Sequence, residues 1–147
     1  MLILLDSGPL GLLSNPSTAA EPRRCRDWMR GHLSANHHVV VAEIADYEVR
    51  RGLLRAGKDL GIDRLDGLIT GLGLEPLTTT AMRQAAQFWA DARQGGRPTA
   101  PDLALDGDVI LAAQAAGLAV LHQDVVVATT NPKHLARFVP ARHWTEV

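Results

Sequence analysis

Three short apolar runs constrain the fold of this 147-residue chain more than any other feature. They occupy residues 2–5, 39–41 and 125–129, and they consist almost entirely of Leu, Ile, Val and Ala. Runs of this length that lack polar alternation are typical of strands covered on both faces, as in a parallel sheet. Parallel neighbours need a crossover connection, so each run should be followed by a helix that returns the chain.

The segments between these runs have the spacing expected of such helices. Apolar residues recur at helical intervals over residues 18–35, 42–56, 60–72, 78–89 and 105–116, and residues 74–77 form a further candidate strand. This alternation predicts an α/β fold, with a central parallel sheet and helices on both faces in an α/β/α sandwich. Residues 1–147 are interpreted as a single domain, because 147 residues suit one core.

Composition and charge limit the cellular location and the binding partners that can be expected for the protein. No apolar run approaches the about 20 residues that a membrane helix needs, and Asp6 interrupts the first run too early for a signal peptide. Cys25 is the only cysteine, which excludes an internal disulfide and favours a packing role. We therefore expect a cytoplasmic protein, and its net charge of -1 gives no overall attraction to nucleic acid.

Three acidic residues occupy positions that this architecture should bring together. Asp6 follows the first apolar run, Glu48 lies within the helix after the second, and Asp108 stands near the start of a later helix. A parallel α/β sheet gathers its ligand site at the carboxyl ends of its strands. Carboxylate oxygens are the ligands that Mg²⁺ and Mn²⁺ prefer. The pattern therefore predicts a divalent-metal site that contains all three acids.

Four segments in order along the chain resemble the motifs of PIN-domain ribonucleases, in particular those of the VapC type. They are Leu-Leu-Asp-Ser-Gly at residues 4–8, Tyr-Glu-Val-Arg-Arg-Gly at 47–52, Asp-Gly-Asp-Val-Ile-Leu-Ala-Ala-Gln-Ala at 106–115, and Ala-Thr-Thr-Asn-Pro-Lys-His-Leu-Ala-Arg-Phe at 128–138. Each segment alone is weakly specific, while the ordered set is more specific and spans residues 2–138.

The resemblance implies a role for each matched position. Asp6, Glu48 and Asp108 correspond to the family's metal-binding acids, and Ser7 corresponds to the residue that orients water beside the first of them. Glu43 fits the second motif less well, and its place at a helix start favours capping. Asp106 is interpreted as a loop or capping residue.

The family's fourth position, usually an aspartate, has two candidates in this chain. If residues 125–129 are the last core strand, the position falls on Asn131, which we prefer. If residues 118–121 are that strand instead, Asp124 takes the position. Asn131 would remove one negative charge from the site, so a second metal would bind weakly or only with substrate.

The activity implied by the resemblance is Mg²⁺-dependent hydrolysis of RNA phosphodiester bonds, with Mn²⁺ as a substitute. The catalytic set would be Asp6, Glu48, Asp108 and Asn131, and the first three would bind the metal. By the same resemblance the protein would be the toxin of a toxin-antitoxin pair, with an antitoxin protein as partner and a homodimeric state. The alternative is a PIN-fold module that binds RNA or a partner protein without cutting.

Overall fold

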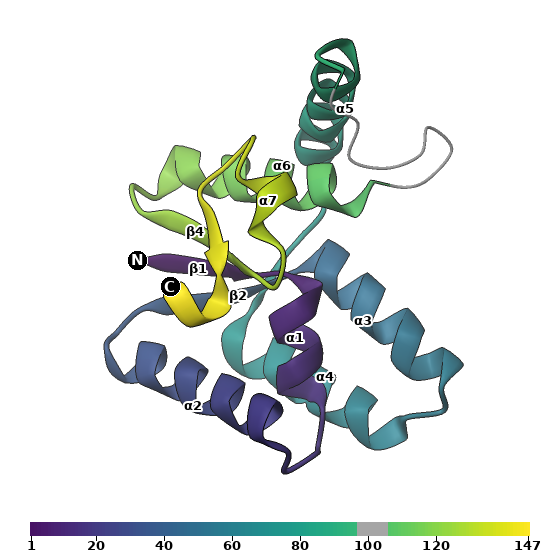
Figure 1. Ribbon diagram of the computed structural model, residues 1–147, viewed down its shortest axis with the longest axis vertical. Helices are drawn as coiled ribbons and strands as arrows, with labels where there is room; N and C mark the ends of the chain where they lie inside the picture. The colour runs from purple at the N-terminus through teal and green to yellow at the C-terminus, as the bar shows by residue number, and fades with distance from the viewer. Residues whose placement is uncertain (97–105) are drawn as a thin grey trace.

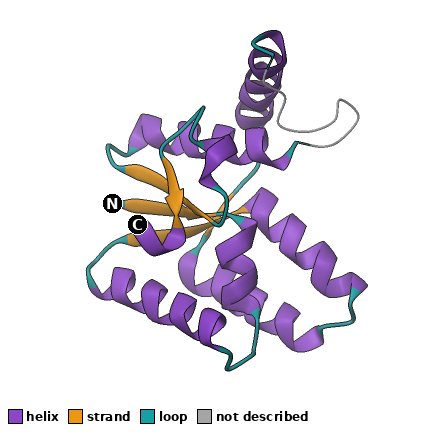
Figure 2. Ribbon diagram, viewed as in Figure 1, coloured by secondary structure: helices purple, strands orange, loops and turns teal. Residues whose placement is uncertain are grey.

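Five parallel strands form one sheet within the part of the chain that the computed structural model describes, residues 1–96 and 106–147 (Figures 1 and 2). The strands are β1 (Leu2–Leu5), β2 (His38–Ala42), β3 (Leu74–Glu75), β4 (Val125–Thr129) and β5 (Ala141–His143). Their order across the sheet is β3-β2-β1-β4-β5, and every pair is parallel. The most apolar run, β1, is therefore the central strand.

The described helices lie in the crossover connections that parallel strands require. They are α1 (Ser7–Ser14), α2 (Ala20–Ser34), α3 (Glu43–Arg55), α4 (Asp59–Leu72), α5 (Thr79–Gln94), α6 (Gly107–Leu121), α7 (Pro132–Leu135) and a final 3-10 turn (Trp144–Glu146). Figure 1 shows α6 on one side of the sheet and α1, α2 and α4 on the other. The predicted parallel α/β architecture with helices on both faces is confirmed.

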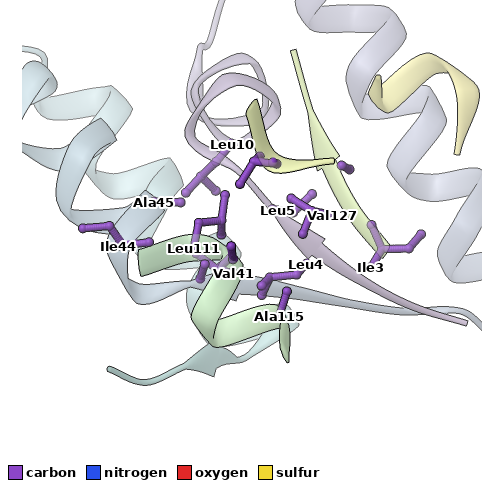
Figure 3. Packing of buried hydrophobic residues seen from close by; sticks show 14 of the residues in the cluster. Ile3, Leu4, Leu5, Leu10, Val41, Ile44, Ala45, Leu111, Ala115 and Val127 are labelled. Carbon is purple, nitrogen blue, oxygen red and sulfur yellow. The ribbon is translucent and has the colours of Figure 1, made fainter. Parts of the chain in front are cut away.

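The core lies where the central strands meet the helices on each side. Figure 3 shows side chains of β1, β2 and β4 in contact with side chains of α1, α3 and α6. Ile3, Leu4 and Leu5 are fully buried, as the absence of polar alternation in β1 predicts. Burying a leucine side chain contributes about 1.5–3 kcal/mol. The strand ends that carry polar residues are thus anchored to a rigid centre.

Two elements differ from what the sequence predicts. Helix α6 continues to Leu121 instead of ending near residue 116, because Leu118 extends its buried face and packs in the core. Residues 118–121 are therefore helical, and the alternative that made them the last core strand is wrong. No strand was predicted after residues 125–129, but Ala141–His143 pairs with β4 as an edge strand.

The lone cysteine has the packing role that the sequence suggests. Cys25 is buried on α2, and its thiol contacts the Pro9 carbonyl at 3.7 Å. Burial, together with the nearby Glu21 charge and against the effect of Arg26, raises the pKa of Cys25 to about 12. The reactive thiolate is therefore scarce near neutral pH.

None of the helices in the described residues is long and apolar enough to cross a membrane. The cytoplasmic location stays a prediction.

Candidate active site

The register of the sheet places the first predicted acid at its carboxyl edge. Leu5 pairs with Val41 on one side and with Ala128 on the other. The backbone N–H of the next residue, Asp6, donates to the Ala128 carbonyl at 3.0 Å. Asp6 thus lies between the ends of β2 and β4, at the edge where an open parallel sheet forms its ligand site.

Short hydrogen bonds hold the Asp6 carboxylate in place. Asp6 caps α1, and its Oδ1 accepts from the Ser7 backbone N–H at 2.6 Å. Its Oδ2 accepts from the hydroxyl of Thr129, the last residue of β4, at 2.6 Å. The Thr129 hydroxyl in turn accepts from the Asn131 backbone N–H at 2.9 Å. This chain of bonds couples the end of β1 to the turn after β4.

Glu48 reaches the same edge from the second turn of α3. Its carboxylate lies against Gly107, where a Cβ atom would overlap Glu48 Oε1. The Ser7 hydroxyl donates to Asp6 Oδ1 at 3.3 Å and lies close enough to Glu48 to lower the pKa of that carboxyl group. Ser7 therefore stands between two of the predicted acids, and Gly107 makes room for one of them at the start of α6.

Asp108 completes the group from the first turn of α6. Its carboxylate is half-buried, and Oδ2 lies 3.1 Å from Nδ1 of His134 on α7. An acid in the first turn of a helix is favoured by the helix dipole. The three acids thus come from the starts of α1 and α6 and from α3, three elements that meet at one edge of the sheet.

Burial and mutual repulsion disfavour the ionised forms of two of these acids. Burial raises the pKa of Glu48, and the Asp6 and Asp108 charges raise it further, while the Ser7 hydrogen bond and Arg51 lower it. Burial also raises the pKa of Asp108, as do Asp6 and Asp106, while His134 lowers it. A bound cation would relieve exactly this repulsion between like charges.

The two candidates for the fourth position lie at opposite ends of β4. Asn131 follows the carboxyl end and forms the N-cap of α7, one hydrogen bond from Thr129. Asp124 precedes the amino end, where its carbonyl accepts from the Leu2 backbone N–H at 2.7 Å. Leu2 is the first residue of β1, whereas Asp6 follows the last one. The length of β1 therefore separates Asp124 from the acids. Only Asn131 is placed near them.

Other charged residues near the acidic cluster have partners of their own. Glu43 does not cap α3 as expected; its carboxylate accepts instead from the Leu77 backbone N–H in the link between β3 and α5. Asp106 is buried at the N-cap position of α6, with a carboxylate oxygen 3.9 Å from Arg93. Arg50 bonds Asp46 at 2.8 Å and Asp66 at 2.7 Å.

The donor chemistry of the cluster suits a hard divalent cation, since every ligand it offers is a carboxylate oxygen. Among the described residues, no three acidic, histidine or cysteine side chains already surround one point closely enough to hold a metal. Mg²⁺ commonly keeps several waters and takes only one or two protein carboxylates directly. Asp6, Glu48 and Asp108 therefore fit such a partly hydrated ion, and they do not form a closed cage.

Sequence reasoning missed the contributions of His134 and Thr129. His134 lies in the fourth motif without an assigned role, yet it contacts Asp108. Thr129 was counted only as part of a strand, yet its buried hydroxyl bonds Asp6. A polar residue at the end of an otherwise apolar strand was the available signal for Thr129. No local pattern marks His134, because its partner is 26 residues away in the sequence.

Solved structures share this fold over nearly the full chain. A chain in the structure of VapBC2 from Rickettsia felis, bound to a DNA fragment from its promoter, matches with a TM-score of 0.75 at 15% identity, covering 98% of this chain and 99% of that one. DNA-bound VapBC from Salmonella typhimurium matches with a TM-score of 0.74 at 20% identity and the same coverage. FitAcB from Neisseria gonorrhoeae matches with a TM-score of 0.70 at 19% identity, covering 99% of both chains.

These likenesses establish the fold. No family model and no curated protein matches the sequence. The resemblance to the PIN fold of VapC-type proteins, first suggested by the order of four weak motifs, is confirmed at the level of three-dimensional structure.

Proposed function

We propose that this protein is a Mg²⁺-dependent ribonuclease that hydrolyses RNA phosphodiester bonds, and that it is the toxin of a toxin-antitoxin pair. The observation that carries the proposal is the convergence of Asp6, Glu48 and Asp108, two of which have raised pKa values because of burial and each other's charge. Acids whose pKa values are raised by burial and by like charges in one place are characteristic of functional sites. The fold shared with VapBC structures supports the same activity.

A divalent ion held by Asp6, Glu48 and Asp108 would lower the pKa of a coordinated water and polarise a phosphoryl oxygen. The residues of the chain would hold this ion and orient its ligands. Asp6, kept in one conformation by Ser7 and Thr129, would be the fixed carboxylate. Glu48 and Asp108 would add charge from α3 and α6, and His134 would orient Asp108 through their 3.1 Å contact. Asn131, the proposed fourth member, would offer an amide in place of a charge.

The proposed partner is an antitoxin protein, and the proposed state of the toxin is a homodimer. The names of the similar structures, VapBC and FitAcB, denote paired proteins, which supports a partner here too. If a small basic or DNA-binding protein is encoded immediately upstream, adding it in equimolar amount should suppress RNA cleavage. Light scattering should give twice the 15.8 kDa chain mass for the isolated protein.

A cleavage assay tests the catalytic proposal. The wild-type protein should cut a labelled single-stranded RNA with Mg²⁺ or Mn²⁺ and spare it with EDTA. Asp108→Asn should lower the rate by about a hundredfold or more, because even the outer partners of metal ligands are worth about 10–100-fold. Asp63→Asn, on the exposed face of α4, is the matched control and should cut normally. Full cleavage by Asp108→Asn would overturn the assignment.

The competing function is a PIN-fold module that binds RNA or a partner without cutting it. The amide of Asn131, where the family usually has an acid, is the observation that favours it. In that case EDTA and Asp6→Asn should leave RNA or partner affinity unchanged, whereas a ribonuclease should bind RNA more tightly with Mg²⁺ than without it. No cleavage should then appear at any metal concentration.

A further inference from the structure

A groove opens beside the acidic cluster, between α3 and the start of α5. Its volume is about 510 Å³, within the range of small-ligand sites. Ile44 and Ile110 are the buried part of its lining, and the partly exposed Met82 and Leu54 continue the apolar surface. Ile110 lies two residues beyond Asp108 on α6. The groove therefore shares α3 with Glu48 and α6 with Asp108.

An exposed aromatic ring and a guanidinium group stand together at the edge of this groove. Tyr47 is 50% exposed, and the Arg51 guanidinium carbon lies 5.1 Å from the centre of its ring. The two residues are one helical turn apart on α3 and flank Glu48. The Arg51 charge also lowers the pKa of Glu48, so the guanidinium lies within electrostatic reach of the acidic cluster.

The neighbouring arginine is differently engaged. Arg50 bonds Asp46 and Asp66, and these two carboxylates offset its charge and keep it in the groove wall. Arg51 remains exposed with its guanidinium over Tyr47. The groove edge thus presents an aromatic face and a positively charged planar group over an apolar floor.

These are the surfaces on which unpaired nucleobases of single-stranded RNA stack. We propose that the groove binds one unpaired base next to the phosphodiester that is cut, with the base stacked on Tyr47 and Arg51. The inference rests on the proposed ribonuclease function, since the acids beside Tyr47 mark where the cut would occur. Positive charge at Arg51 complements the negative RNA backbone, and an exposed aromatic face can stack with a base of any sequence.

The test uses a single-stranded RNA with one 2-aminopurine, a base whose fluorescence is quenched by stacking. It is bound to the full-length Asp6→Asn protein, so that the RNA stays intact. We expect quenching with Asp6→Asn, loss of quenching and about tenfold weaker binding when Tyr47→Ala is added, and recovery with Tyr47→Phe. Leu33→Ala, which removes an exposed apolar side chain on α2, is the matched control and should change nothing.

Cleavage measured in parallel separates the two proposals. In the otherwise wild-type protein, Tyr47→Ala should raise KM about tenfold and leave kcat within about twofold, because stacking contributes to binding. Quenching without cleavage by the wild type would remove the ribonuclease and keep the base site. Equal quenching with and without Tyr47, or no RNA binding by Asp6→Asn, would overturn the base site. A change in molecular mass caused by Tyr47→Ala would overturn it as well and assign the groove to contact between copies.

Discussion

The hydroxyl of Thr129 joins the two strand ends on which the acidic cluster depends. It donates to Asp6 and accepts from the Asn131 backbone, and the side chain is fully buried. A buried hydroxyl with both bonds made fixes its partners, since breaking either would leave a polar group unsatisfied. The position of Asp6 is therefore set by β4 as much as by its own strand.

The acids of the cluster should destabilise the metal-free protein at neutral pH. Because burial and neighbouring charges raise the pKa values of Glu48 and Asp108, the folded state holds protons that the unfolded state has released. Stability contributed at acid pH is then lost as the pH rises through the folded pKa values. Glu48→Gln and Asp108→Asn should therefore raise Tm in EDTA near pH 7, and the gain should shrink toward about pH 4.

Thermal unfolding in EDTA across this pH range measures the effect. Asp63→Asn is again the control and should leave Tm unchanged. Mg²⁺ should remove the advantage of the variants by stabilising only the wild type. Equal Tm values for the wild type and both cluster variants at every pH would show that the acids do not repel one another.

Asn131 should limit how tightly the site holds a metal. Its backbone is one hydrogen bond from the hydroxyl that holds Asp6, so an acid at this position would join the cluster. Asn131→Asp should therefore tighten Mn²⁺ binding in calorimetry, by about tenfold. Asn36→Asp, on the exposed turn before β2, is the matched control and should have no effect. Unchanged affinity in Asn131→Asp would remove residue 131 from the site.

At the scale of elements, the buried strands were the most predictable part of the chain. Residues 2–5 and 125–129 match β1 and β4 exactly, because a continuous apolar run leaves few alternatives to a covered strand. The edge strand β5 was not predictable. Its sequence, Ala-Arg-His, is neither apolar nor alternating. It becomes a strand only because the edge of β4 that does not pair with β1 offers backbone hydrogen bonds.

The candidate site was likewise predictable only in part. Asp6, Glu48 and Asp108 were foreseeable because a parallel sheet aligns its strand ends, so position in the chain predicts position in space. The choice between Asn131 and Asp124 depended on whether residues 118–121 form a strand or a helix. An apolar run of four residues is compatible with both structures. The contact of His134 with Asp108 depends on how α7 packs on α6 and could not be read from either segment.

The turn between α2 and β2 should make stability depend on pH in the opposite sense to the acids. The Nδ1 atoms of His32 and His37 lie 2.8 Å apart. Burial lowers the pKa of His32, and His37 lowers it further, against a hydrogen bond to the Val147 backbone that raises it. As the pH falls below the usual histidine pKa of about 6.5, the unfolded chain gains a proton that folded His32 resists, and stability is lost.

Urea unfolding at pH 7, 6 and 5 tests this. Between pH 7 and pH 5 the wild type should lose free energy of unfolding relative to His32→Gln, because the acids contribute equally to both proteins. His38→Gln, at the exposed start of β2, should leave the pH dependence as in the wild type. Parallel curves for His32→Gln and the wild type would contradict the expected role of the histidine pair.

For the whole molecule, the arrangement of charge matters more than its total. The net charge is -1, so nothing draws RNA to the protein as a whole. At the carboxyl edge of the sheet three acids would repel a phosphate until a cation is bound. The protein should therefore engage the scissile phosphate only together with the metal, and metal uptake and cleavage should rise together.

Calorimetric titration of the wild-type protein with Mn²⁺, followed by assay of labelled RNA at each metal concentration, tests this claim most directly. We expect Mn²⁺ to bind, cleavage to follow the fraction of protein that holds metal, and EDTA to remove the metal and stop further cleavage. Asp6→Asn should lose the binding heat and the cleavage together. RNA binding with no uptake of Mn²⁺ and no cleavage would contradict the account.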